Sequence, residues 1–411
     1  MRRQRALKNK TKLLIVGITM NPAGTEKSFL SFLSALDFNR YDVTLLLAKR
    51  EGLLLDQLPA HLNVQAMEKY GDMFLLSGKN AAKTLFSCFV KENPLTLFEI
   101  FPYFVEILFT KGEKRASAAT RMWLHFMKKM PCVKEEYDVA AAYWGDRTMF
   151  YVCDKVKAKK KITWLHFDYA NPPRDDKIYL PYFKKCDSVV TVSRLVDDAF
   201  RAKLPEIADR TVMMENIISP AQIRALAEVG GTFPDTDFSG KRILTVGRIS
   251  DQKGIDFIPA VLKRLHEEGF DVRWYILGDG EADYRRYVER LLAEAGVADM
   301  LVFLGTTQNP YAYIRDCDVY AQPSRYEGKP IAVEEAKILC KPILAAHYLS
   351  APEQLEDGTL GIICNTDSDS IYDGIKKLLC DEPLCDTLRQ TLASRDFSNT
   401  DEIEKFYKIV E

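Results

Sequence analysis

Two glutamates flank a tight turn in Ser324–Ala336, SRYEGKPIAVEEA. Glu327 lies in the turn, and Glu335 follows in a helix that Pro330 is suited to begin. Paired carboxylates can act as a general acid and base, an acid in a first turn can stabilise a helix, and either group can accept hydrogen bonds from hydroxyls. At about 100° per residue, Glu335 flanks the apolar stripe and Glu334 faces solvent. The pattern favours Glu327 and Glu335 as hydroxyl acceptors.

Two cations follow an apolar run in VGRISDQKG, residues 246–254. Arg248 and Lys253 are separated by a loop after Gly247, and a helix is expected to start near Gly254. Cations beside a helix N-terminus bind anions, because the free N–H groups add to their charge. The spacing suits one diphosphate. The alternative is a pair of solvated surface cations.

Two further features lie in the first half of the chain. Gly24, in NPAGTEKSF, opens a helix after the first expected strand and allows close backbone approach. His166, in TWLHFDYANPP, ends another expected strand, where a histidine is either a site residue or structural. The motif G-x-G-x-x-G is absent, so a nicotinamide enzyme is poorly supported.

Short apolar runs must carry these residues, and they alternate with helical patterns. The first series of runs is 13–17, 43–48, 139–143, 162–166 and 188–193. The second is 242–247, 272–278, 301–305, 319–324, 342–346 and 360–364. Continuous apolar runs are typical of parallel strands covered on both faces. Residues 218–241, rich in Gly, Pro, Asp and Ser, separate the series as a linker. The sequence predicts two doubly wound α/β halves with their loops facing each other.

The composition excludes several classes of protein. The nine cysteines form no C-x-x-C pair and the five histidines are far apart, so we expect no metal site, and reduced thiols in a cytoplasmic protein. No apolar signal core precedes the first strand, and charges interrupt the most apolar region, residues 84–110.

Charge is divided unequally along the chain. Residues 1–130 hold 20 Lys and Arg against 11 Asp and Glu, a balance of +9, and the remainder balances it to the net −1. An excess of cations indicates an anionic partner or membrane surface, although solvated lysines explain it equally. The aromatic segment 84–110 either lies at a membrane interface or packs on its own domain. No motif indicates nucleic acid.

Together these motifs resemble the family 4 retaining glycosyltransferases of GT-B fold, along nearly the whole chain. VGRISDQKGID resembles the family's Gly-Arg…Lys-Gly segment, and the Glu327–Glu335 stretch resembles its Glu-x7-Glu segment. AGTEKSFLSFLSAL and the His166 strand resemble the corresponding first-domain segments. The Glu-Gly-Lys-Pro variant is most similar to that of bacterial surface-polysaccharide enzymes.

The resemblance implies roles for individual residues. Arg248 and Lys253 would hold a donor diphosphate, Glu335 the ribose, and Glu327 the transferred sugar. His166 would lie near the reacting carbon, and Gly305 and Asn309 near the base. The implied catalytic residues are His166, Arg248, Lys253 and Glu327. The implied donor-binding residues are Gly24, Gly247, Arg248, Lys253, Gly305, Asn309, Glu327, Gly328, Lys329, Pro330, Ile331 and Glu335.

These inferences predict two Rossmann-like domains facing across a cleft. We expect residues 1–213 to form the acceptor-side domain, 214–241 a linker, 242–395 the nucleotide-sugar domain, and 396–411 a helix packing back on the first domain. The resemblance implies a metal-independent, cofactor-free hexosyltransferase that uses a UDP-sugar and extends a lipid-linked or glycan acceptor in surface polysaccharide synthesis. It would work in the cytoplasm at the inner face of the membrane. A non-catalytic nucleotide-sugar-binding protein and a GT-B nucleotide-sugar epimerase are the alternatives.

Overall fold

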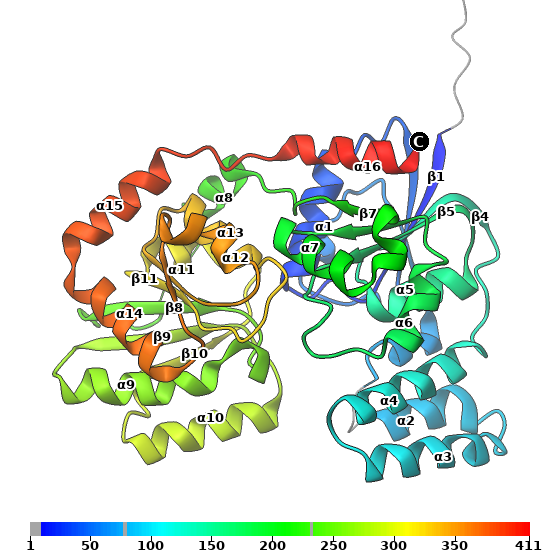
Figure 1. The fold of residues 1–411 in the computed structure, drawn as a ribbon, viewed down its shortest axis with the longest axis horizontal. Helices are drawn as coiled ribbons and strands as arrows, with labels where there is room; N and C mark the ends of the chain where they lie inside the picture. The colour runs from blue at the N-terminus through cyan, green and yellow to red at the C-terminus, as the bar shows by residue number, and fades with distance from the viewer. Residues whose placement is uncertain (1–9, 77–79, 231–232) are drawn as a thin grey trace, which may run out of the picture.

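The computed structural model describes residues 10–76, 80–230 and 233–411. Two parallel sheets, one from each half of the chain, lie side by side with helices around them (Figure 1). The first has the order β3-β2-β1-β4-β5-β6-β7 and the second β10-β9-β8-β11-β12-β13. In each sheet the strand order changes direction beside the strand that comes first in the chain, between β1 and β4 and between β8 and β11. Ligands of doubly wound sheets bind at such a point. The predicted fold class is therefore confirmed.

The first sheet contains the five predicted strands and two others. Its strands are β1 Thr11–Gly17, β2 Tyr41–Leu47, β3 Asn63–Ala66, β4 Glu136–Ala142, β5 Lys157–Leu165, β6 Ser188–Thr191 and β7 Thr211–Met213. Alternate residues of β1 enter different cores: Leu14 packs on one face and Leu13 on the other. Burial on both faces explains its continuous apolar run. The edge strand β3 has no such run because it is largely exposed.

All six strands predicted for the second sheet are present. They are β8 Lys241–Val246, β9 Val272–Leu277, β10 Leu301–Gly305, β11 Val319–Gln322, β12 Ile343–Ala346 and β13 Ile362–Cys364. Neighbouring residues again divide between two cores, as Ile243 and Leu244 do in β8. The site loops therefore leave a rigid sheet at the carboxyl ends of its strands.

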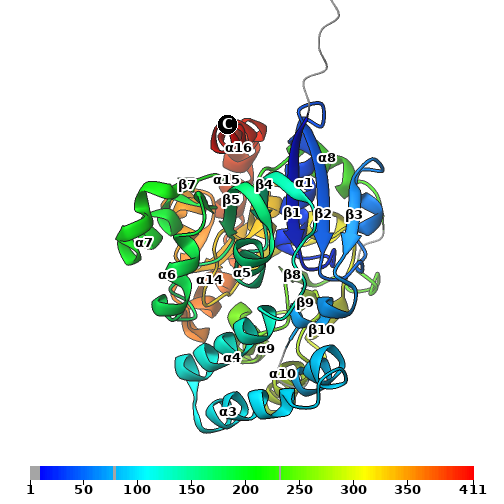
Figure 2. The same cartoon turned by 90° about the vertical axis from the view of Figure 1, so that its right-hand side faces the viewer.

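The helices of the first domain include a layer inserted between β3 and β4. They are α1 Gly24–Ala35, α2 Ala81–Leu85, α3 Thr96–Phe109, α4 Gly112–Met127, α5 Asp146–Lys155, α6 Asp176–Phe183 and α7 Arg194–Lys203. Helix α4 attaches the inserted layer to the sheet through Met122, Trp123 and Phe126. The indole of Trp123 donates to the carbonyl of Met73 at 2.7 Å. Helix α3 lies at the end of the molecule, outside α4 (Figure 2).

The helices of the second domain pack their apolar stripes on its sheet. They are α8 Pro220–Ala227, α9 Ile258–Glu267, α10 Ala282–Ala295, α11 Tyr311–Asp316, α12 Ile331–Ile338, α13 Ala351–Gln354, α14 Ser368–Cys380 and α15 Glu382–Ala393. Helix α9 buries residues 258, 261, 262 and 265, the spacing of one helical face. Helix α8 lies inside the segment predicted as a linker, where Ser219 caps it and Ile223 packs near Ile338.

The chain crosses between the domains twice, and the crossings lie side by side. The side-chain amide of Asn399 donates to the carbonyl of Asn216 at 3.0 Å, and its oxygen accepts from the backbone N–H of Ile218 at 2.8 Å. After the second crossing, helix α16 (Ile403–Val410) packs Phe406 and Tyr407 into the first domain. Among the described residues, no helix is long and apolar enough to cross a membrane.

Candidate functional site

The loop after β8 brings Arg248 and Lys253 to the edge of the second sheet. Gly254 ends it with a left-handed backbone, φ 64°, and a Cβ there would lie 2.1 Å from the carbonyl oxygen of Pro323. Only glycine therefore fits at this turn. A Cβ at Gly247 would similarly meet the Lys253 side chain at 2.9 Å. Arg248 remains exposed, with its guanidinium available to an anion.

Glu327 is buried and held by several donors. One carboxylate oxygen, Oε1, accepts from Lys253 Nζ at 2.6 Å, Ser324 Oγ at 2.6 Å and Gln322 Nε2 at 3.0 Å. The other, Oε2, is 3.5 Å from Gln252 Nε2. These contacts fix the carboxylate beside the cationic loop and pair it with Lys253. The structure therefore brings together Glu327 and Lys253, which the sequence predicted for one site.

Glu335 is 1% exposed and belongs to an ion pair between the domains. Its Oε1 accepts from Lys27 Nζ of α1 at 2.8 Å, and that ammonium lies 5.0 Å from the centre of the Tyr311 ring. Its buried Oε2 has no hydrogen-bond partner in the part of the chain that the structure describes. A buried carboxylate oxygen without a donor is costly, and a ligand hydroxyl would satisfy it.

The prediction that Glu334 faces solvent is wrong. Glu334 is 6% exposed, and its carboxylate accepts from Lys337 Nζ at 2.8 Å and from Gln354 Nε2 at 2.9 Å. Glu334 does lie on the side of α12 away from its apolar stripe, but α13 packs against that side and buries it. A helix's own sequence does not record what another element places against it.

Glu26, in the first turn of α1, is a site residue that sequence reasoning missed. Burial raises the pKa of its carboxyl to about 7, although the indole N–H of Trp144 and the charge of Arg248 oppose the shift. The Trp144 hydrogen bond is 3.1 Å long. Glu26 therefore lies close enough to Arg248, in the other domain, to be affected by its charge.

His166 ends β5 within a buried polar network. Its ring lies against that of Tyr143, with centroids 4.8 Å apart, and its buried Nε2 has no partner among the described residues. Burial lowers the pKa of the imidazole to about 4, so the ring is neutral at neutral pH. Ser28 Oγ lies 2.6 Å from the Tyr143 hydroxyl and donates to Asn216 at 2.7 Å. The network fixes the floor of the first domain beneath the site.

The two domains touch at Gly328. A Cβ there would lie 2.2 Å from the carbonyl oxygen of His166. The turn between Glu327 and Pro330 therefore rests directly on the end of β5. The structure brings together His166, Gly328 and Glu327 in one interdomain site, with Arg248, Lys253 and Glu335 on loops and helices around it.

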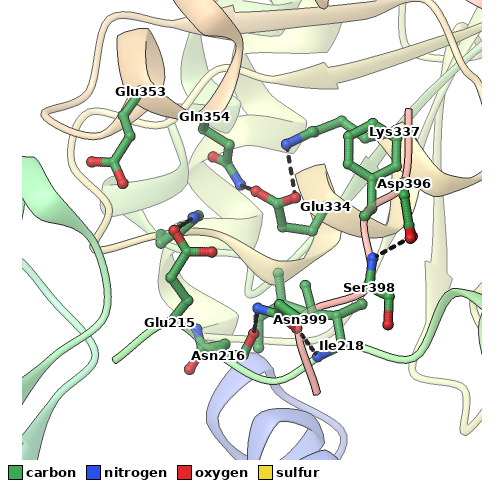
Figure 3. A pocket seen from close by; sticks show the side chains of 13 residues that line it. Glu215, Asn216, Ile218, Glu334, Lys337, Glu353, Gln354, Asp396, Ser398 and Asn399 are labelled. Atoms are coloured by element: carbon green, nitrogen blue, oxygen red, sulfur yellow. Dashed lines mark hydrogen bonds and ion pairs between the residues drawn. The ribbon is translucent and has the colours of Figure 1, made fainter. Parts of the chain in front are cut away.

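Three consecutive residues predicted for the donor, Lys329, Pro330 and Ile331, have contacts near the joint between the domains. Lys329 pairs with Glu215 at 2.8 Å, and Ile331 lines the same cavity of about 280 Å³ (Figure 3). The Pro330 carbonyl accepts from Gln354 Nε2 at 2.9 Å. This cavity lies behind α12, between the two chain crossings. The side chain of Lys329 therefore takes part in the interdomain joint, and its predicted contact with the donor stays a prediction.

Asn309 is also engaged elsewhere. Its amide donates to the carbonyls of Leu226 at 2.8 Å and Val229 at 2.7 Å, which fixes the end of α8. Its side chain is not free to recognise a base. By contrast, a Cβ at Gly24 or Gly305 would meet nothing within 4 Å, so both glycines border open space. The predicted approach of a ligand to Gly24 stays a prediction.

Sequence reasoning also missed the residues that support the site. They are Glu26, Lys27, Ser28, Asn216, Gln252, Tyr311, Gln322 and Ser324. Their one sequence signal is proximity to motifs already singled out, as for Glu26 and Lys27 beside Gly24. Among the described residues, no group of three or more His, Cys, Asp or Glu is placed to hold a metal ion.

Comparisons with known proteins relate the second domain to a known family. Residues 235–394 match the family described as "Glycosyl transferases group 1". An alpha-D-kanosaminyltransferase of Streptomyces kanamyceticus is 28% identical over 154 residues, 37% of this chain and 39% of the relative. A diphospho-undecaprenol N-acetylgalactosaminyltransferase of Campylobacter jejuni is 28% identical over 152 residues, 36% of this chain and 40% of the relative. The chain thus spans less than half the length of these relatives.

Solved structures match over nearly the whole chain. Anabaena HepE in complex with UDP-glucose has a TM-score of 0.67 and 16% identity, and the match covers 97% of this chain and 100% of HepE. WaaG, a glycosyltransferase involved in lipopolysaccharide biosynthesis, has a TM-score of 0.61 and 13% identity, covering 97% and 99%. At such identity these matches show the fold. The chain has the GT-B fold, and its residues 235–394 are similar to the family of group 1 glycosyl transferases.

Proposed function

We propose that this protein is a retaining glycosyltransferase that moves a sugar from a nucleoside diphosphate donor, a UDP-sugar, to a lipid-linked or glycan acceptor. The observation that carries the proposal is the convergence of an exposed cation, Arg248, with the Lys253–Glu327 pair at the edge of the second sheet. A departing nucleoside diphosphate develops negative charge, and preorganised cations stabilise it. Arg248 and Lys253 supply that charge from protein groups, so we propose a metal-independent reaction that uses no cofactor.

The carboxylates would recognise hydroxyl groups. The unpartnered Oε2 of Glu335 would accept from the donor ribose, and Glu327 from the transferred sugar. His166, neutral at neutral pH, would present Nε2 beside that sugar without adding charge. Gly24 and Gly305 leave space on the two sides of the site.

Retention follows from attack on the same face that the leaving group departs from. In this scheme the departing phosphate oxygen takes the acceptor's proton, and the acceptor oxygen bonds to the anomeric carbon as the bond to phosphate breaks. The carboxylate of Glu327 is bound to Lys253 and Ser324, which suits hydroxyl recognition better than nucleophilic attack. A covalent glycosyl-enzyme is therefore not part of the proposal.

Two further parts of the proposal concern the acceptor. The Campylobacter relative is named for a diphospho-undecaprenol substrate, and WaaG for lipopolysaccharide biosynthesis. By analogy we propose a surface polysaccharide precursor as acceptor, and work in the cytoplasm at the inner face of the membrane. HepE, solved with UDP-glucose, supports uridine as the donor base.

The test measures donor use by purified protein. A panel of nucleotide sugars is screened for thermal stabilisation, which identifies the donor, and then for hydrolysis and transfer. Arg248→Ala and Lys253→Ala should each lose at least a hundredfold in turnover, whereas Lys263→Ala, an exposed lysine on α9, should keep it. Near-normal turnover in either site variant contradicts the diphosphate assignment. Release of an epimerised donor would indicate an epimerase, and binding without turnover a non-catalytic protein.

A further inference from the structure

One face of helix α3 presents large apolar side chains to solvent. Phe98 is 77% exposed and Phe109 80%, far above what a folded domain usually leaves to large aromatic residues. The exposed apolar residues of this region are Phe86, Leu95, Leu97, Phe98, Phe101, Phe104, Leu108 and Phe109. Clustered apolar groups of this kind mark an interaction surface. We call this set the α3 outer face.

The exposure is not a failure of packing, because α3 already has a half-buried side that holds it to the domain. Ile100, Tyr103 and Ile107 pack on the core of the first domain. Leu97, Phe101, Phe104 and Leu108 follow a similar helical spacing on an adjacent side, about 100° further round the helix. A surface helix needs one apolar stripe to hold it in place, and α3 carries two. The second stripe contacts nothing in the described part of the chain that would bury it.

Exposed cations lie in the segments that flank α3 in the chain. Between residues 80 and 127, Lys83, Lys91, Lys111, Lys114 and Arg115 are exposed and form no ion pair with any described residue.

The acidic groups of the same layer are largely neutralised. Glu92 pairs with Lys69, Glu99 with Lys129, and Glu106 with Arg121. Glu113 is exposed without an ion pair among the described residues, which leaves five unpaired cations against one unpaired acid between residues 80 and 127. The patch therefore combines an apolar centre with an unbalanced positive border.

This combination distinguishes between two occupants. In a symmetric dimer each patch meets its own copy, so the unpaired cations would face like charges. An anionic bilayer supplies apolar depth for the phenylalanines and negative charge for the lysines. The charge of the border therefore favours a lipid surface over a second copy of this chain.

The position of α3 gives the docked protein an orientation. In both views α3 lies at the end of the molecule opposite α16, which follows the second chain crossing (Figures 1 and 2). Helix α10 of the second domain lies toward the same end in both views. Docking through α3 would therefore bring both domains near the surface and keep the crossings away from it.

We propose that the α3 outer face, bordered by Lys83, Lys91, Lys111, Lys114 and Arg115, inserts into the interfacial region of an anionic bilayer. The helix would lie parallel to the surface, with its phenylalanines at the level of the acyl boundary. The proposal deepens the proposed function and rests on it for the acceptor, since a lipid-linked acceptor would then reach the protein from the side on which α3 and α10 lie.

The test is flotation of the full chain with vesicles. We expect wild type to float with vesicles of phosphatidylcholine and phosphatidylglycerol at low salt, and much less with phosphatidylcholine alone or at high salt. Phe98→Ser/Phe101→Ser/Phe104→Ser and Lys111→Gln/Lys114→Gln/Arg115→Gln should each weaken binding at least tenfold. Leu53→Ser/Val229→Ser, which removes exposed apolar groups elsewhere, should leave it unchanged. Circular dichroism checks that each variant is folded.

Other outcomes have definite meanings. Absence of wild-type flotation at low salt overturns the proposal, as does unchanged flotation of both triple variants. A dimer in sedimentation that the phenylalanine variant dissociates, without vesicle binding, assigns the face to a second copy. Hydrolysis of soluble donor is measured alongside, because α3 contains no site residue. Wild type that floats with vesicles but hydrolyses no donor would refute the proposed function and still support the docking surface.

Discussion

At the scale of single residues, Glu335 is the most specific feature of the site. One oxygen is bound to Lys27, and the other is buried without a partner. The carboxylate was predicted from helical phase and family resemblance, but its partner was not, because Lys27 lies 308 positions away in the chain. Sequence shows which groups lie on one helix, and only the fold shows which groups of two domains meet.

Glu335→Gln should weaken donor binding about tenfold and change turnover little, because it weakens the charge-assisted hydrogen bond that we propose to the donor ribose. Isothermal titration calorimetry with the donor gives the affinity, and steady-state kinetics give kcat. Glu334→Gln is the matched control at the preceding position, where the carboxylate contacts Lys337 and Gln354 instead. Equal loss of affinity in both variants would contradict the assignment.

Glu26 should make stability depend on pH. Its pKa rises from 4.5 to about 7 on folding, so the folded state retains the proton more strongly than the unfolded chain. The associated stability is complete below pH 4.5 and is lost as the pH rises to about 7. Glu26→Gln removes the titrating group and can still accept from Trp144. It should be more stable than wild type at pH 8, by on the order of 3 kcal/mol, and equal at pH 4.5. Urea unfolding at both pH values measures this; a constant difference would show that Glu26 does not titrate as described.

At the scale of elements, sequence patterns worked where both faces of an element are buried. The continuous apolar runs of β1 and β8 predicted strands because neighbouring side chains of each run pack into two different cores. The same reasoning missed β3, an exposed edge, and placed Glu334 in solvent. In each case the outcome depends on an element elsewhere in the chain. Lys329 and Asn309 belong to the same class, since their partners are in α8 and the first chain crossing.

Helix α16 should stabilise a domain to which it does not belong in sequence. Phe406 lies 5.0 Å from Phe32 and 6.1 Å from Trp164, ring centre to ring centre. Phe406→Ala should therefore destabilise the first domain by about 3–5 kcal/mol. Urea unfolding followed by tryptophan fluorescence reports the loss. Glu404→Ala, an exposed position of the same helix, should unfold like wild type.

At the scale of the whole molecule, a few contacts set the distance between the domains. Gly328 rests on the carbonyl of His166, Lys27 pairs with Glu335, and the Glu353 carboxylate accepts from the backbone N–H groups of Arg194 and Leu195 at 3.1 and 3.0 Å. The site exists only when these surfaces meet. The GT-B fold itself could be predicted from the sequence, but this closeness could not.

Gly328→Ala should separate the domains while leaving each one folded. The added methyl group would lie 2.2 Å from the His166 oxygen, a backbone atom that can yield only if the domains move. Displacement of about 1 Å at a catalytic site costs about a hundredfold in rate. Small-angle scattering should show a larger radius of gyration, with donor hydrolysis reduced. Unchanged scattering together with unchanged hydrolysis would mean that the loop absorbs the methyl group.

The docking of α16 has a consequence for the order in which the protein is made. The core of the first domain includes Ile403, Phe406 and Tyr407, and these residues are synthesised only after the whole second domain. While the ribosome is translating the second domain, the apolar side chains of the first domain that contact α16, such as Phe32 and Tyr41, therefore lack those contacts. Once α16 has been synthesised, it covers those side chains, and the hydrogen bond between Asn399 and Asn216 joins the two crossings at the same stage. Completion of the first domain and assembly of the interdomain joint are thus coupled in time.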